Sequence, residues 1–162
     1  MARAYISIGS NINRENNIRA GVNALRCSYG PLIISRVFES EAVGFQGDNF
    51  YNLVVGFDTD EAPRIITRAL HEIEHACGRK RDGPRFGPRA LDLDLLLYDN
   101  LVIDEPGLQV PRDDTLDYAF VLQPLAEIAP HLPHPVLSKR YADLWAAFDK
   151  PLNRLWPVEL EL

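Results

Sequence analysis

The chain of 162 residues has the length of one domain, and its hydrophobic content of 46% is enough for a sizeable core. Its formal net charge of −6 argues against general affinity for nucleic acid. There is no signal-peptide pattern and no apolar run near the roughly 18 residues of a membrane span, and Cys27 and Cys77 lie in neither a zinc-site nor a disulfide spacing. We therefore expect one cytoplasmic domain, residues 1–162, with both cysteines as buried thiols.

Periodicity and chain-breaking residues predict four strands and two helices in the first hundred residues. In chain order we expect a strand over 2–7, a helix over 14–26 with Asn13 as N-cap, strands over 32–43 and 50–58, a helix that begins at Thr59 or Asp60, and a strand that ends at Tyr98. This βαββαβ order is typical of a ferredoxin-like α+β sandwich.

The remaining segments predict smaller elements. Residues 9–11, Gly-Ser-Asn, predict a turn after the first strand that can bring the backbone close to a ligand. Residues 101–110 are compatible with a small hairpin, and short helices are expected within 120–130 and 141–148. The acidic tail after Trp156 gives no structural signal.

The second helix has an apolar face and a polar face. Ile66, Leu70 and Ile73 recur at helical spacing, whereas His71 and His75 share the opposite face. Two histidines four residues apart leave a metal site open, but the order of a HExxH zinc motif is absent. A solvated polar face is the other interpretation.

A cationic segment follows this helix, which Gly78 is expected to end. Arginines stand at positions 79, 81, 85 and 89, separated by glycines and prolines. Guanidinium groups match phosphate oxygens and keep their charge at any working pH. The segment therefore indicates a local anion site, and its glycines suggest a loop that can close over a bound nucleotide.

The next strand carries two carboxylates, Asp92 and Asp94. Because successive strand side chains alternate between faces, these two share one face while Leu91, Leu93 and Leu95 share the other. A solvated strand face or a turn would explain an isolated Asp-x-Asp. Here the flanking leucines indicate a buried strand, where unpaired carboxylates are costly, so we favour a Mg²⁺ site that also takes substrate phosphates.

Residues 85–94 read Arg-Phe-Gly-Pro-Arg-Ala-Leu-Asp-Leu-Asp. This run resembles the signature of the 6-hydroxymethyl-7,8-dihydropterin pyrophosphokinase family, in which an arginine, an aromatic residue and Gly-Pro-Arg precede a small residue and Leu-Asp-Leu-Asp. The resemblance implies a pyrophosphokinase of folate biosynthesis that transfers pyrophosphate from ATP to the hydroxymethyl group of a reduced pterin and releases AMP. Its partners would be pterin and ATP, with neither nucleic acid nor membrane, and we expect a monomer.

The resemblance also implies roles for individual residues. Arg79 and Arg89 match the catalytic arginines, and Asp92 and Asp94 would hold two Mg²⁺ ions. Further ATP contacts are implied for Glu74, Arg81, Arg85, Leu95 and Arg112. Pterin contacts are implied for Ser40, Val43, Phe50, Asn52, Phe86 and Phe120. Among these, the two rings at 86 and 120 would sandwich the pterin, and the amide at 52 would hydrogen-bond it.

Three positions depart from the family pattern. The family has Val-Pro-His where this chain has Val-Pro-Arg ending at Arg112, and an arginine where this chain has Tyr118. Its Thr-x-Pro segment is here Ser-Glu-Ala from Ser40. These changes bear on nucleotide handling and on the identity of the pterin.

Other function classes remain open from the sequence. A pterin- or nucleotide-binding paralogue without turnover is favoured by the missing histidine and arginine and opposed by the retained Asp92, Asp94, Arg79 and Arg89. An RNA-binding sheet would need exposed aromatic residues and a basic face, which the net charge opposes. A nucleotide-sugar transferase could also use Asp-x-Asp, but the chain is short for that class.

Overall fold

The computed structural model describes residues 1–42, 46–78, 90–149 and 154–162. Its elements are β1 (Ala2–Ser10), α1 (Arg14–Tyr29), β2 (Ile33–Ile34), β3 (Val37–Ser40), β4 (Phe50–Thr59), α2 (Pro63–Ala76), β5 (Asp92–Tyr98), β6 (Ile103–Glu105), β7 (Leu108–Val110), α3 (Asp114–Asp117), α4 (Ala119–Ile128), α5 (Tyr141–Ala146) and β8 (Leu155–Val158). No helix in this part of the chain is long and apolar enough to cross a bilayer.

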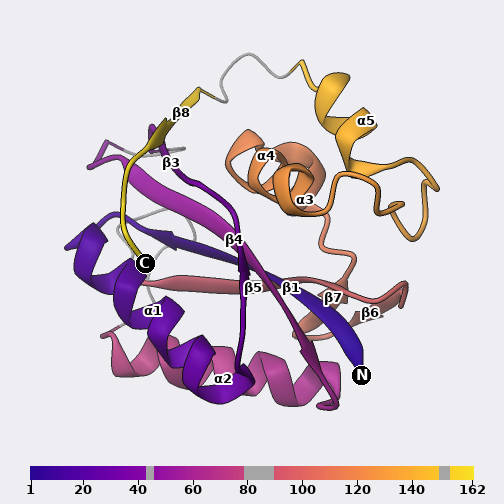
Figure 1. Cartoon of the computed structure of the whole chain (residues 1–162), viewed down its shortest axis with the longest axis horizontal. Helices are drawn as coiled ribbons and strands as arrows, with labels where there is room; N and C mark the ends of the chain where they lie inside the picture. The colour runs from indigo at the N-terminus through magenta and orange to yellow at the C-terminus, as the bar shows by residue number, and fades with distance from the viewer. Residues whose placement is uncertain (43–45, 79–89, 150–153) are drawn as a thin grey trace.

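One antiparallel sheet organises the chain (Figure 1). Its strands lie in the order β5-β1-β4-β3-β8, and β2 pairs with β4 beside β3. Both long neighbours of β1 run antiparallel to it, so β1 lies between β4 and β5. The predicted α+β ferredoxin-like order is confirmed, and the predicted hairpin is the separate pair β6-β7.

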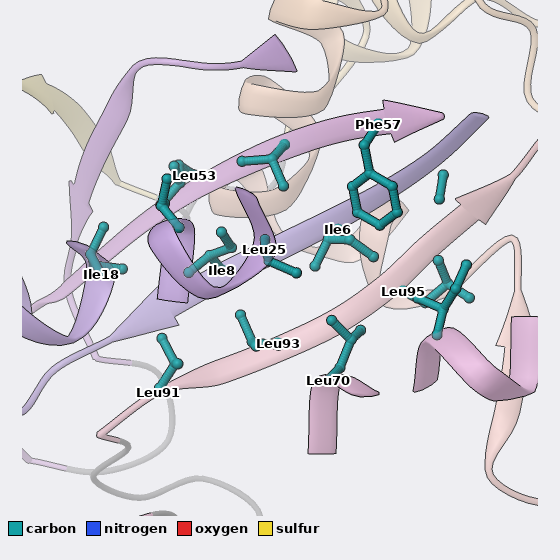
Figure 2. Close-up of a cluster of buried hydrophobic side chains, with 14 of the residues drawn as sticks. Ile6, Ile8, Ile18, Leu25, Leu53, Phe57, Leu70, Leu91, Leu93 and Leu95 are labelled. Carbon is teal, nitrogen blue, oxygen red and sulfur yellow. The ribbon is translucent and has the colours of Figure 1, made fainter. Parts of the chain in front are cut away.

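The sheet is covered on both faces. Helices α1 and α2 lie on one face, and α3, α4 and α5 lie on the other (Figure 1). Under α1 and α2, the leucines at 91, 93 and 95 pack with the aliphatic side chains of both helices (Figure 2), as the alternation predicted. Leu96 and Leu97 instead join the second apolar cluster, which includes Leu122 and Leu125 of α4.

A β-bulge in β5 explains this change of face. Tyr5 of β1 pairs with Leu97 and Ile6 pairs with Leu95, so Leu96 is an extra residue on β5. Its carbonyl oxygen accepts a hydrogen bond from the backbone N–H of Arg112, at 3.0 Å. The bulge therefore attaches the chain that follows the hairpin to the strand that carries the two aspartates.

The predicted long strand over 32–43 is wrong, because it is interrupted between β2 and β3. The Ser35 hydroxyl oxygen accepts the Val54 N–H at 2.9 Å, in place of a main-chain carbonyl. The Arg36 N–H leaves the sheet and donates to Glu127 Oε1 of α4 at 2.8 Å, while its guanidinium contacts the other carboxylate oxygen at 2.9 Å. A side chain on a distant helix thus ends the strand.

Other differences concern element ends and the thiols. β1 continues through residues 9 and 10, where a turn was predicted, and α2 begins at Pro63 because the Thr59 hydroxyl first accepts the Glu61 N–H in a turn. The tail contains β8, which pairs with β3, and α3 was not predicted. Cys27 is exposed and Cys77 partly exposed, so the expectation of buried thiols is wrong.

Glu127→Ala should lower the free energy of unfolding by about 1–2 kcal/mol, because it removes the acceptor of two charge-assisted hydrogen bonds at a partly exposed site. Glu127→Gln should cost less, since its amide oxygen can still accept the Arg36 N–H. Urea unfolding measures both. The control Glu72→Ala, on the exposed face of α2, should stay within about 0.5 kcal/mol of the natural chain. Equal losses at 127 and 72 would contradict this role.

Candidate active site

Two carboxylates stand on one face of β5, near its N-terminal end. Asp92 lies opposite Gly9 of β1 and Asp94 opposite Ser7, and both aspartates are partly exposed. Leu93, between them, is 2% exposed and packs on the other face. The predicted separation of acid and aliphatic faces is therefore confirmed, and it presents four carboxylate oxygens on one side of the sheet.

A polar row crosses the sheet from these carboxylates. Gly9 pairs with Asp92 on one side and with Asn52 of β4 on the other. Asn52 is 6% exposed, and its Nδ2 donates to the Ser40 hydroxyl at 2.8 Å. A Cβ at position 9 would lie 2.9 Å from Asn52 Oδ1 and 3.9 Å from the Phe50 ring. Glycine thus leaves room for the amide to extend over β1 toward Asp92.

The structure therefore brings together several of the predicted site residues. Phe50 and Asn52 of β4 lie beside Gly9, the residue of β1 that pairs with Asp92, and Ser40 of β3 accepts a hydrogen bond from Asn52. From the sequence, Gly9 was expected in a turn that brings the backbone close to a ligand, and its contact with Asn52 was not predicted. That contact depends on the pairing register of β1 with β4, which cannot be read from the local sequence pattern.

Glu74 supports the same strand from its outer edge. Its side chain is only 1% exposed, and Oε2 accepts the Leu93 N–H at 2.8 Å. Because β5 is the last strand of the sheet on that side, α2 supplies the acceptor that a further strand would have supplied. Its predicted contact with ATP stays a prediction. The Leu95 side chain is in the core, so its predicted nucleotide contact would have to be made by main-chain atoms.

Arg112 lies beside the carboxylates. Its Nη2 is 3.6 Å from Asp94 Oδ1 and 3.3 Å from Asp114 Oδ2. All three side chains are about one-third exposed, at 35%, 31% and 33%. Asp114 was not predicted to belong to the site, since α3 itself was not expected. The arginine that departs from the family pattern thus stands next to a predicted metal ligand.

Phe120, a predicted pterin wall, lies in the first turn of α4 and is partly exposed. Tyr118, two residues earlier, stacks on it with ring centroids 5.0 Å apart and an interplanar angle of 21°. An aromatic neighbour thus occupies the position where the family pattern has an arginine.

Several predicted site residues cannot be placed. Those that lie outside the described residues are Val43, Arg79, Arg81, Arg85, Phe86 and Arg89. The segment that contains the arginines lies between Gly78 and Ala90. The Ala90 carbonyl oxygen accepts a hydrogen bond from the Ser10 hydroxyl, which ties the start of β5 to the end of β1.

The donor set suits a hard cation. Carboxylate oxygens from one strand, open to solvent on one side, match the way Mg²⁺ is held by one or two carboxylates plus water and phosphate oxygens. Within the described ranges no three His, Cys, Asp or Glu side chains gather as a ligand set, and His71 and His75 are exposed on α2. A closed zinc-type site is therefore absent from that part of the chain, and Asp92 and Asp94 fit Mg²⁺.

Comparison with known proteins gives consistent results. The family model described as 7,8-dihydro-6-hydroxymethylpterin-pyrophosphokinase (HPPK) matches residues 5–130. A 2-amino-4-hydroxy-6-hydroxymethyldihydropteridine pyrophosphokinase of Aquifex aeolicus is 34% identical over 159 residues, 97% of this chain and 96% of that protein. The protein of the same name from Pseudomonas aeruginosa is 39% identical over 137 residues, 82% of this chain and 84% of its own length.

The fold is found in solved structures as well. A Plasmodium falciparum HPPK-DHPS crystal structure matches with a TM-score of 0.70 at 13% identity, over 90% of this chain. The match covers 44% of that longer protein, so this chain spans less than half of it. At this identity the likeness concerns the fold alone. Together with the family match over most of the sequence, it leads to one conclusion: the chain belongs to the HPPK family of pyrophosphokinases.

Proposed function

We propose that this chain transfers the pyrophosphoryl group of ATP to the hydroxymethyl oxygen of 6-hydroxymethyl-7,8-dihydropterin. The observation that carries the proposal is the row Asp92, Gly9 and Asn52, which sets the strand of the carboxylate pair beside a buried amide that can hydrogen-bond a ligand. Membership of the HPPK family supports the same reaction.

In the proposed reaction the pterin hydroxyl oxygen bonds to the β-phosphorus of ATP. The bond from that phosphorus to the oxygen bridging to the α-phosphate breaks, AMP leaves with this oxygen, and the hydroxyl proton passes to solvent or a nearby base. Such transfers depend mainly on positioning and on neutralising phosphate charge. The chain's task is therefore to hold two molecules in line and to supply positive charge.

The described residues fit the pterin half of this task. Because Asn52 Nδ2 is committed to the Ser40 hydroxyl, its Oδ1 is oriented over Gly9 and can accept an N–H from the amide edge of a pterin. Phe50 and Phe120 supply apolar walls, and we assign Val43 and Phe86 to the same slot. The hydrogen bond to Ser40 fixes the amide orientation before the pterin arrives.

For the phosphate half we assign Asp92 and Asp94 as ligands of two Mg²⁺ ions. When bound, these ions would offset the negative charge of the triphosphate and of the transferring group. Arg79 and Arg89 would stabilise the transferring group and the α-phosphate, and Arg81 and Arg85 would contact ATP. Glu74, Leu95 and Arg112 complete the proposed nucleotide contacts.

We further propose that the active unit is a cytoplasmic monomer with one domain over residues 1–162. The two apolar clusters pack on opposite faces of the same sheet, which supports a single domain.

Asp94→Asn should reduce pterin-dependent AMP formation from ATP and Mg²⁺ by about 100-fold or more, the scale of losing one transition-state electrostatic contact. Chromatography of AMP with and without pterin measures it. Asp104→Asn, an equal charge change on exposed β6, should keep the natural rate. If the natural chain binds pterin and ATP but forms no AMP, the chain is a binding paralogue and the proposal is wrong.

Gly9→Ala should raise the KM for pterin by about tenfold, because its Cβ displaces Asn52 Oδ1 and costs about one hydrogen bond. The melting temperature should change little, since the displaced atom ends a polar side chain. Gly56→Ala offers a matched contrast. Its Cβ would lie equally close, 2.9 Å, to the buried Tyr5 ring, so it should lower the melting temperature and leave the pterin KM unchanged. The reverse pattern would contradict the pterin pocket.

A further inference from the structure

We propose that Arg112 is a built-in counter-ion that competes with the divalent metal for Asp94 and shifts to Asp114 when the metal binds. The guanidinium lies between the two carboxylates, with Nη2 3.6 Å from Asp94 Oδ1 and 3.3 Å from Asp114 Oδ2. This inference rests on the proposed function, in which Asp94 is a metal ligand. It adds a residue that sets how strongly Asp94 can bind the metal.

The main chain at Arg112 is fixed, so the guanidinium stays within reach of the carboxylates. Its N–H is bonded to the bulge carbonyl of Leu96, and its carbonyl oxygen accepts the Thr115 N–H at 3.2 Å. The next residue is also held, because Gln109 bonds both the N–H and the carboxylate of Asp113. Only the long side chain is left to move.

The side chain has two carboxylates to choose between. It donates to Asp114 at hydrogen-bond distance, whereas its contact with Asp94 is a longer ion pair. It is 35% exposed, so a small rotation toward Asp114 does not require the core to open. The arrangement therefore offers a cation that can leave Asp94 without losing its charge partner.

The Arg112 guanidinium opposes metal binding at Asp94. A divalent ion on Asp94 would stand close to a guanidinium of like sign, so the side chain has to withdraw from Asp94. Asp114 favours metal binding in this scheme, because it holds the withdrawn guanidinium. Since the groups are partly exposed and screened by water, each effect should be modest, about three- to tenfold in affinity.

Binding of Mn²⁺ to the nucleotide-free full chain, followed by the electron paramagnetic resonance signal of the free ion, tests this directly. Arg112→Ala should tighten Mn²⁺ binding about three- to tenfold, and Arg112→Lys should stay near the natural affinity because the charge remains. Asp114→Asn should weaken binding about threefold by leaving Asp94 as the guanidinium's partner. Asp113→Asn, an equal charge change on the adjacent residue, should have a smaller effect.

The double variant separates a direct coupling from general electrostatics. Asp114→Asn should have little effect once Arg112→Ala is present, because its action passes through the guanidinium. If Mn²⁺ binding is lost in Asp94→Asn but is unchanged by Arg112→Ala, the counter-ion inference is overturned and the metal assignment stands. If binding does not depend on Asp94 at all, both the metal assignment and this inference are overturned.

Discussion

The pairing of β1 with a strand on each side determines where the polar groups of the site stand. Antiparallel pairing with β5 sets Asp92 opposite Gly9, and pairing with β4 sets Asn52 opposite the same glycine. Residues opposite one another share a face of the sheet, so Asp92, a proposed metal ligand, and Asn52, a proposed pterin contact, lie on the same face with a glycine between them. A shift by one residue would send the aspartates and the amide to opposite faces.

Polar groups contact the edge strand β5 both at its outer edge and on its open face. On the outer edge, the buried Glu74 carboxylate accepts the N–H between the two aspartates, which fixes the start of β5. On the open face, Arg112 offsets Asp94 and Asp114. The β-bulge at Leu96 connects these features, since its carbonyl holds the main chain of the arginine. The carboxylate pair is thus positioned by elements that follow it in sequence as well as by those before it.

Local patterns predicted the fold class and the acidic face, whereas features that depend on distant contacts escaped prediction. Alternating leucines were sufficient to place Asp92 and Asp94 on one face, because successive side chains of a strand point to opposite faces of the sheet. The interruption at Arg36 depends on Glu127, 91 residues away, and the edge strand β8 depends on pairing with β3. The contact at Gly9 likewise depends on register. The roles given to the arginines at 79–89 rest on resemblance and remain predictions.

The most direct test of the account is a ³¹P nuclear magnetic resonance spectrum of the complete reaction with ATP, Mg²⁺ and 6-hydroxymethyl-7,8-dihydropterin. Transfer of an intact pyrophosphoryl group predicts AMP and a pterin diphosphate ester in equal amounts, the ester showing two mutually coupled phosphorus signals. ADP together with a pterin monophosphate would mean attack at the γ-phosphorus. AMP accompanied by free pyrophosphate would mean that water is the acceptor, and either result would contradict the proposed reaction.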